Sequence, residues 1–126
     1  MAYYEHLPIY KAAYDFALYC EKIVSRFSKQ HRYRIGGDLL DLSRLIARLV
    51  VRANNRQDKL PVLYKLRETL EELKLIIRLC KDIKAFHNFN SFETSIKHVI
   101  DISKQNEGWI RSQGGKGFGP EPSPDA

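Results

Sequence analysis

Cysteine is scarce in this sequence: its 126 residues include only Cys20 and Cys80. Each lies within an apolar pattern of helical spacing, so we expect both to be small buried side chains in a reducing compartment. Segment 1–20 lacks a basic region followed by an apolar run, so we expect no signal peptide. No uninterrupted apolar run approaches the roughly 18 residues that a membrane span requires. The sequence therefore predicts a soluble, cytoplasmic protein with no membrane partner.

Motifs of catalysis are also missing. The segment "RIGGDLL" is too short for a P-loop or a dinucleotide fingerprint, and it is more typical of a helix start. No histidine pair shares a helix face with a glutamate at metal-ligand spacing; the histidines are His6, His31, His87 and His98. The acidic turn Glu68, Glu71 and Glu72 lies among basic residues, which is typical of a solvated face. We therefore predict no catalytic residue, no metal and no cofactor, and hence no enzyme. A small hydrolase or nuclease is the least favoured hypothesis.

Apolar residues recur at helical spacing in four segments, and no segment alternates with the period of two that marks a strand. The predicted helices cover about residues 7–28, 37–54, 60–86 and 91–111. The expected core positions of the first two are Ile9, Ala13, Phe16, Cys20, Ile23, Phe27, Leu39, Leu42, Ile46, Leu49 and Ala53. Those of the last two are Leu63, Leu66, Leu70, Leu73, Ile77, Cys80, Phe92, Ile96, Val99 and Ser103.

Short links between long helices favour antiparallel packing. The sequence therefore predicts an all-α fold, an antiparallel up-down-up-down four-helix bundle formed by residues 1–112. Residues 113–126 are rich in glycine and proline, and we expect a disordered tail there. Asp58 is the expected N-cap of the third helix. Asn90 or Ser91 can cap the fourth, and Glu93 fits a capping box with Asn90.

Basic residues exceed acidic ones, 21 to 15, which gives a net charge of +6. The excess is concentrated, because residues 26–59 contain nine lysines and arginines but three aspartates. A basic region of this size indicates an acidic partner, with nucleic acid as the first candidate and an acidic protein as the second.

Four arginines stand four residues apart in this region, and we call them the arginine ladder: Arg44, Arg48, Arg52 and Arg56. On a helix they lie nearly above one another, drifting about 40° per step and spanning about 18 Å. Like charges at this spacing repel and destabilise a helix by about 0.2–0.5 kcal/mol per pair. We therefore expect another interaction to compensate for this repulsion. Either the ladder pairs with acids of a neighbouring helix, such as Glu68, Glu71 and Glu72, or it binds phosphates or an acidic groove.

The binding hypothesis is favoured because too few acids lie in the basic region to neutralise the ladder. Lys29, Arg32 and Arg34, with Arg26, extend the candidate surface from the preceding loop. Base-specific recognition has no support, because Tyr33 is the only aromatic residue interleaved with the charges.

Some apolar residues lie off the main stripes: Leu45, Val50, Val51, Leu75, Ile76 and Leu79. A helix that is apolar over more than one face is deeply buried or packs against another subunit. Self-association and a wide core face are equally good explanations.

Four blocks carry a family resemblance: "HLPIYKAAYDFALYCEKIV", "GDLLDLSRLIARLVVRANNRQDKLPVL", "LRETLEELKLIIRLCKDIKAF" and "FNSFETSIKHVIDISKQNEGW". From about His6 to Ser112 the chain resembles the accessory variability determinant (Avd) proteins of diversity-generating retroelements. The most specific parts are "RANN", "RLCK" and "SKQNEGW". A more distant resemblance is to four-helix-bundle proteins encoded in intervening sequences of bacterial large-subunit ribosomal RNA genes.

The resemblance implies a non-catalytic accessory subunit, a basic homopentamer of four-helix bundles. It would bind the element's reverse transcriptase and its template RNA or cDNA, and so support mutagenic retrohoming. The residues matching the family's basic partner-binding surface are those of the arginine ladder. The more distant resemblance implies the alternative, a structural or RNA-binding protein of the ribosomal RNA intervening-sequence type. The tail after Ser112 lies outside the resemblance.

Overall fold

The computed structural model describes residues 3–116 and consists of four long α-helices with two short helical turns. The elements are η1 (Tyr3–His6), α1 (Pro8–Val24), α2 (Lys29–Arg32), α3 (Ile35–Asn54), α4 (Leu60–Asp82) and α5 (Phe89–Ser112). Within this part of the chain no residue belongs to a β-strand. No helix among the described residues has the length and apolar character needed to cross a membrane.

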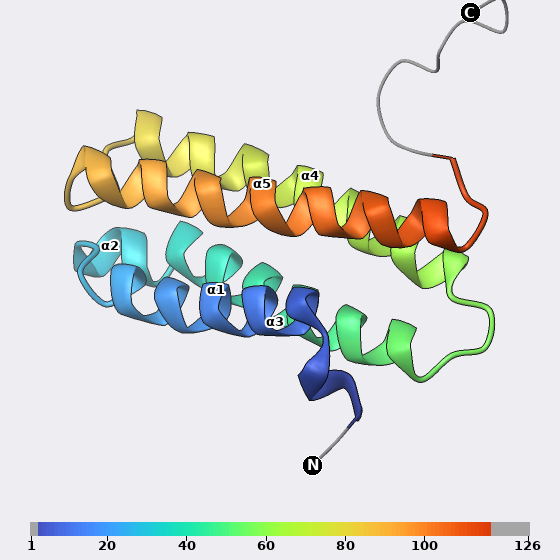
Figure 1. The fold of residues 1–126 in the computed structure, drawn as a ribbon. Helices are drawn as coiled ribbons and strands as arrows, with labels where there is room; N and C mark the ends of the chain where they lie inside the picture. Colours follow the sequence, from blue (N-terminus) through green and yellow to red (C-terminus); the bar gives the residue numbers. More distant parts are fainter. Residues whose placement is uncertain (1–2, 117–126) are drawn as a thin grey trace, which may run out of the picture.

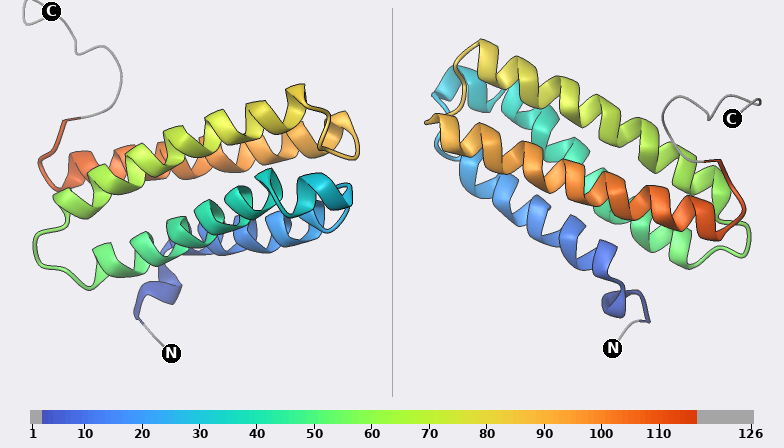
Figure 2. Two further views of the ribbon diagram at one scale, coloured as in Figure 1. Left: turned by 180° about the vertical axis from the view of Figure 1, so that it is seen from behind. Right: turned by 45° about the horizontal axis from the view of Figure 1, so that its top comes forward.

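The long helices form two layers, with α1 beside α3 in one and α4 beside α5 in the other (Figure 1). The two views in Figure 2 show the same arrangement from behind and from above. Neighbouring helices run antiparallel, and the packed pairs are α1 with α3, α3 with α4, α4 with α5 and α1 with α5. The predicted antiparallel up-down-up-down four-helix bundle is therefore confirmed.

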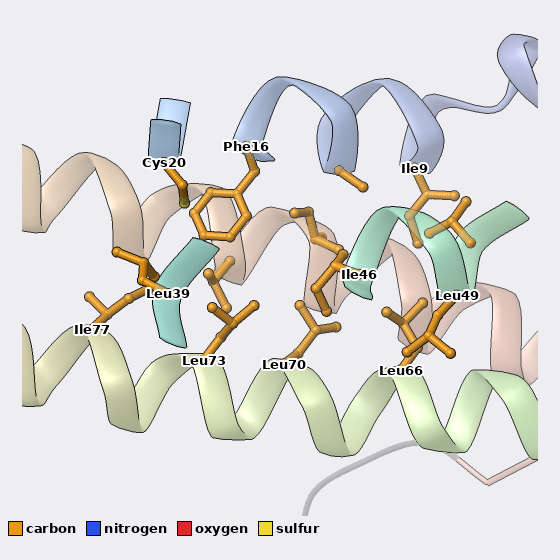
Figure 3. Packing of buried hydrophobic residues seen from close by; sticks show 14 of the residues in the cluster. Ile9, Phe16, Cys20, Leu39, Ile46, Leu49, Leu66, Leu70, Leu73 and Ile77 are labelled. Atoms are coloured by element: carbon orange, nitrogen blue, oxygen red, sulfur yellow. The ribbon is translucent and has the colours of Figure 1, made fainter. Parts of the chain in front are cut away.

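The core is built from the apolar stripes of the four helices. Figure 3 shows Phe16 of α1, Ile46 of α3 and Leu70 of α4 pointing into a common interior. Every core position expected on α1 and α4 is buried, and so is Phe27, which follows α1. On α3, Leu42 is half-buried, whereas Val50, which we had placed off the stripe, is fully buried.

The buried stripe of α5 differs from the predicted one. Of the expected positions only Val99 is fully buried, while Phe92, Ile96 and Ser103 are half-buried. The structure instead buries Ser91, Ser95, Val99, Ile102, Asn106 and Ile110. The true stripe is partly polar, so an apolar pattern does not reveal it.

Hydrogen bonds offset part of the cost of burying these polar side chains, although Asn106 Oδ1 has no partner among the described residues. Ser95 Oγ donates to the carbonyl oxygen of Ser91 at 2.7 Å. Asn106 Nδ2 donates across the helix pair to the carbonyl oxygen of Leu63 on α4, at 3.1 Å. This last bond ties α5 to α4 inside the core.

Four helix ends differ from the prediction by two to four residues, and one of them is the start of the fourth helix, at Phe89 and not at 91. The first helix ends at Val24 and not at about 28, and the polar segment after it forms the short helix α2. Ser28 is the N-cap of α2, and its Oγ accepts a hydrogen bond from His31 N at 3.4 Å. The second helix begins at Ile35 and not at 37.

The third helix ends at Asp82 and not at about 86. Lys84 there takes a positive φ of 61°, and the Ala85 amide donates to the Cys80 carbonyl at 2.8 Å, a bond that closes the helix end.

The predicted N-caps of α4 and α5 are wrong. The N-cap of α4 is Lys59 and not Asp58, with no side-chain cap hydrogen bond. The N-cap of α5 is Asn88, whose Oδ1 accepts from the Ser91 amide at 2.9 Å, so the box of Asn90 and Glu93 does not form. An asparagine two residues earlier serves the same purpose, because any short polar acceptor can satisfy the first free amides.

The start of the predicted tail packs on the bundle. Within the described residues, Arg67 Nη2 donates to the Lys116 carbonyl at 2.6 Å, and the Gly115 amide donates to the Ile110 carbonyl at 2.9 Å. Residues 113–116 are therefore part of the fold, and the rest of the predicted disordered tail, 117–126, lies outside the described residues.

Both cysteines are fully buried and unpaired. Burial raises the pKa of each thiol to about 12. Their prediction as small core side chains is confirmed.

Gly36 allows α3 to start close against the end of α1. A Cβ atom there would meet Val24 Cγ1 at 2.8 Å and the His31 carbonyl oxygen at 3.0 Å, whereas a Cβ on Gly37 would meet nothing within 4 Å. We expect Gly36→Ala to lower the free energy of unfolding by about 1–2 kcal/mol through overpacking. Gly37→Ala, the matched control, should be neutral or raise it by up to about 1 kcal/mol. Urea unfolding measures both, and equal effects of the two changes would contradict the close approach.

His98 lies between α1 and α5, with its ring 5.6 Å from Phe16 and 5.2 Å from Tyr19 between centroids. Burial lowers the pKa of His98, and the carboxylates of Asp15 and Asp101 oppose this shift only in part. The unfolded chain therefore binds this proton more readily, so the free energy of unfolding falls as the pH drops below about 6.5.

We expect His98→Gln to remove this part of the pH dependence, in urea unfolding between about pH 7.5 and 5.5. The control is His87→Gln, at an exposed loop position, which should retain the wild-type slope. If His98→Gln leaves the pH dependence of the free energy of unfolding unchanged, His98 is not its source.

Candidate nucleic-acid interface

The helix α3 presents three members of the arginine ladder to solvent. Arg44, Arg48 and Arg52 lie on α3 and are exposed, and each is one turn from the next. Arg56 is also exposed but lies beyond the end of the helix at Asn54, in the link to α4. The helical part of the ladder is therefore about 12 Å long, shorter than the 18 Å expected for four helical positions.

Arg44 is engaged by acids of its own subunit. Its Nη2 donates to Glu21 Oε1 on α1, and its Nη1 lies 4.0 Å from Asp41 Oδ1. Both partners of the Arg44–Glu21 pair are about half exposed, so the pair contributes at most about 1 kcal/mol. Arg44 is consequently a poor candidate for the centre of a binding surface.

The remaining three arginines form what we call the free arginine row: Arg48, Arg52 and Arg56. Within residues 3–116, none of their side chains forms an ion pair or a hydrogen bond. Their guanidinium groups are exposed to water with all donors available.

The acids of α4 do not neutralise the ladder. We had considered pairing with Glu68, Glu71 and Glu72, but no ion pair among the described residues joins α3 to α4. Glu71 pairs instead with Lys74 of its own helix, at 2.7 Å. Within residues 3–116, the only cross-helix pair of the ladder is the one to Glu21 on α1.

The other predicted site residues lie near the opposite end of α3. Lys29 and Arg32 are on α2, and Arg34 is the N-cap residue of α3; all three are exposed. Arg32 Nη2 donates to the Phe27 carbonyl at 3.3 Å.

Exposed Asp38 and Asp41 on α3 lie between this group and the free arginine row. The structure therefore shows two separate basic regions where the sequence predicted one surface.

The charges of α3 change sign along the helix, from Asp38 in the first turn to Arg52 in the last. Acids near the N-terminus and cations near the C-terminus each stabilise the helix dipole, by about 0.3–1 kcal/mol. Part of the cost of the ladder is thus offset within α3 itself. This explanation does not extend to Arg56, which lies outside the helix.

Lys59 holds the chain after α3 in place beside the free arginine row. Its Nζ donates to the carbonyl oxygens of Ala53 and Asn54, each at 3.1 Å, and of Arg56 at 2.6 Å. The first two are carbonyls of the last turn of α3, and the Ala53 carbonyl also accepts from the Arg56 amide at 3.2 Å. Sequence inspection missed this role, although a lysine shortly after a helix end is its usual signal.

The free arginine row is suited to polyanions. Planar guanidinium groups donate paired hydrogen bonds to phosphate or carboxylate oxygens. Tyr33 is 72% exposed but follows α2, at the far end of α3 from the row. Among residues 3–116, no cluster of histidine, cysteine, aspartate or glutamate is arranged to hold a metal ion.

The apolar residues that lie off the predicted stripes differ in how deeply they are buried. Val50 belongs to the core, and Leu45, Val51 and Ile76 are half-buried, as a wide core face requires. Leu75 and Leu79 stay exposed, at 56% and 41%. The wide-core explanation therefore holds for α3 but not for all of α4.

Comparison with known proteins gave no matching family model and no matching curated protein.

We expect Lys59→Met to lower the free energy of unfolding by about 1 kcal/mol, because it leaves the last carbonyls of α3 without a cationic partner. The methionine keeps most of the apolar stem, so packing changes little. Lys65→Met on the exposed face of α4 is the matched control and should change stability by less than about 0.5 kcal/mol. Equal chemical denaturation curves for the two variants would show that the hydrogen bonds of Lys59 to the end of α3 do not stabilise the protein.

Proposed function

We propose that this protein is a non-catalytic accessory subunit of a diversity-generating retroelement. In this proposal it binds the element's reverse transcriptase and its template RNA or cDNA through a basic surface, and so supports mutagenic retrohoming. Its partners are the polymerase, the nucleic acid and further copies of the same chain, assembled as a homopentamer in the cytoplasm. The polymerase carries out the chemistry.

One observation carries the nucleic-acid part of the proposal: the free arginine row is exposed and has no carboxylate partner among the described residues. Arg48 and Arg52, which lie one turn apart on α3, repel each other, and a bound anion would remove this repulsion. The net charge of +6 adds a long-range attraction for polyanions. Arg48, Arg52 and Arg56 are thus the residues we assign to phosphate binding.

The remaining parts rest on the sequence resemblance, together with exposed apolar side chains that suit self-association. Leu18 on α1 is 56% exposed and Leu79 on α4 is 41% exposed. Covering such side chains favours assembly, because about 25 cal/mol is gained per Å² of apolar surface removed from water. Light scattering after size-exclusion chromatography will give the number of subunits.

We expect the triple change Arg48→Glu, Arg52→Glu and Arg56→Glu to abolish binding of a single-stranded RNA, because it replaces three phosphate donors with repelling charges. For the wild-type protein, three phosphate contacts predict about 20-fold weaker binding when salt rises from about 50 to 200 mM. Fluorescence anisotropy with a labelled template RNA measures both effects, and circular dichroism checks that the helices persist.

The matched control is Lys97→Glu, Lys104→Glu and Arg111→Glu on α5, all exposed and seven residues apart. It changes the net charge by the same amount but leaves the free arginine row intact, so it should retain most RNA binding. Equal losses in the two triple variants would show that overall charge, and not this row, governs binding. Retained binding in the first variant would remove these arginines from the proposal.

The alternative is a structural or RNA-binding protein of the ribosomal RNA intervening-sequence type. A basic bundle with a free arginine row suits that function equally well, since both involve RNA. A pull-down of the reverse transcriptase encoded beside the gene separates the two, because only the accessory subunit should bind a polymerase. A neighbouring ribosomal RNA operon, without a polymerase gene, would favour the alternative.

A further inference from the structure

The outer seam between α4 and α5 is hollowed and apolar. A hollow of about 390 Å³ is lined by Lys74, Leu75 and Arg78 of α4 and by Ile96 and Ile100 of α5. Leu75 is 56% exposed and Ile100 is 41% exposed. The right-hand view of Figure 2 shows α4 and α5 side by side along this seam.

A second hollow continues the seam toward the link between the two helices. It has a volume of about 190 Å³, and its apolar lining is Phe86, Phe89 and Phe92. Phe89 is 62% exposed. Phe92 and Ile96 are one turn apart on α5, as are Ile96 and Ile100, so the two hollows share one row of apolar side chains.

The seam is basic as well as apolar. Lys74 and Arg78 line the first hollow, and Lys81 and Lys84 line the second, whereas no described carboxylate lines either. Lys74 is paired with Glu71 at 2.7 Å, and Lys81 lies 4.9 Å from the centre of the Phe92 ring. Arg78 and Lys84 form no ion pair within residues 3–116.

We propose that the α4–α5 seam is a docking site for an acidic amphipathic helix of a protein partner. An apolar floor with cations along it complements a helix that carries aliphatic residues on one face and acids beside them. Self-association is assigned elsewhere, because the exposed side chains that we give to it, Leu18 and Leu79, line neither hollow. The proposal is independent of RNA binding, which we assign to α3.

The length of the seam specifies the ligand. From Phe89 to Ile100 the row spans about 16 Å, which corresponds to three turns of a docked helix. Anchors at positions i, i+4 and i+7 occupy two of these three turns, about 10 Å, and the flanking acids reach the cations of α4. Leucine-sized anchors suit the hollow beside Leu75 and Ile100.

The test uses the full-length protein and a fluorescein-labelled helical peptide with leucines at i, i+4 and i+7 among glutamates. Fluorescence anisotropy should show saturable binding of this peptide. A peptide of the same composition in scrambled order, and one with lysines in place of the glutamates, should bind at least about tenfold more weakly. Equal binding of the scrambled peptide would overturn the proposal, since only general charge attraction would remain.

The double variant Leu75→Ser, Ile100→Ser should weaken binding of the acidic peptide about tenfold, because both side chains are exposed anchors and not core. Arg78→Gln should weaken it less and reduce its salt dependence. The control variant Arg48→Gln, Arg52→Gln, Arg56→Gln should bind the peptide as the wild type does. Thermal unfolding followed by circular dichroism checks that each variant is folded.

Three other outcomes would overturn the proposal. Unchanged affinity in the Leu75→Ser, Ile100→Ser variant places the peptide elsewhere. A fall in the mass of the assembly by light scattering in that variant, with no peptide binding by the native protein, assigns the seam to a second copy. Loss of oligouridylate binding in that variant, again without peptide binding, assigns it to RNA.

Discussion

Among residues 3–116, each of the four long helices packs mainly against two other long helices, and this constraint decides where the core and the charged surfaces lie. Since the four long helices surround one common core, each buries one face in the core and exposes the opposite face to solvent. Ile46 and Leu49 occupy the dry face of α3, and the arginines one or two positions away must then face water. The basic surface is therefore a direct consequence of the packing that places aliphatic residues in the core.

The parts of the fold that the sequence predicted are those with unbroken aliphatic stripes. On α1 and α4 the expected core residues alternate by three and four, so both helices and most of their buried positions could be inferred. Val24, Val62 and Thr69 are also buried but lie off the predicted stripes. The exposure of Arg48 and Arg52 followed from the same pattern. The pattern misplaced two residues of α3: Leu42 is only half-buried, and Val50 is fully buried. The reason is that α3 is buried over a wider arc than one stripe.

What could not be predicted depends on contacts between segments distant in sequence. The Arg44–Glu21 pair depends on how α1 and α3 are aligned, which neither helix encodes alone. The burial of Ser95 and Asn106 depends on backbone acceptors that a hydropathy pattern does not record. Arg56 was assigned to the ladder by its spacing, but helix ends are set by local capping, here by Lys59, and not by periodicity.

The amide of Asn106 has a consequence beyond satisfying a buried group. Sliding α5 by one turn along α4 would remove the Leu63 carbonyl from its reach and leave the amide unpaired in the core, at a cost of about 1–3 kcal/mol. This bond therefore favours one register of α5 against α4. Because the same two helices line the hollow that contains Leu75 and Ile100, their register decides which side chains of α4 and α5 stand opposite each other there.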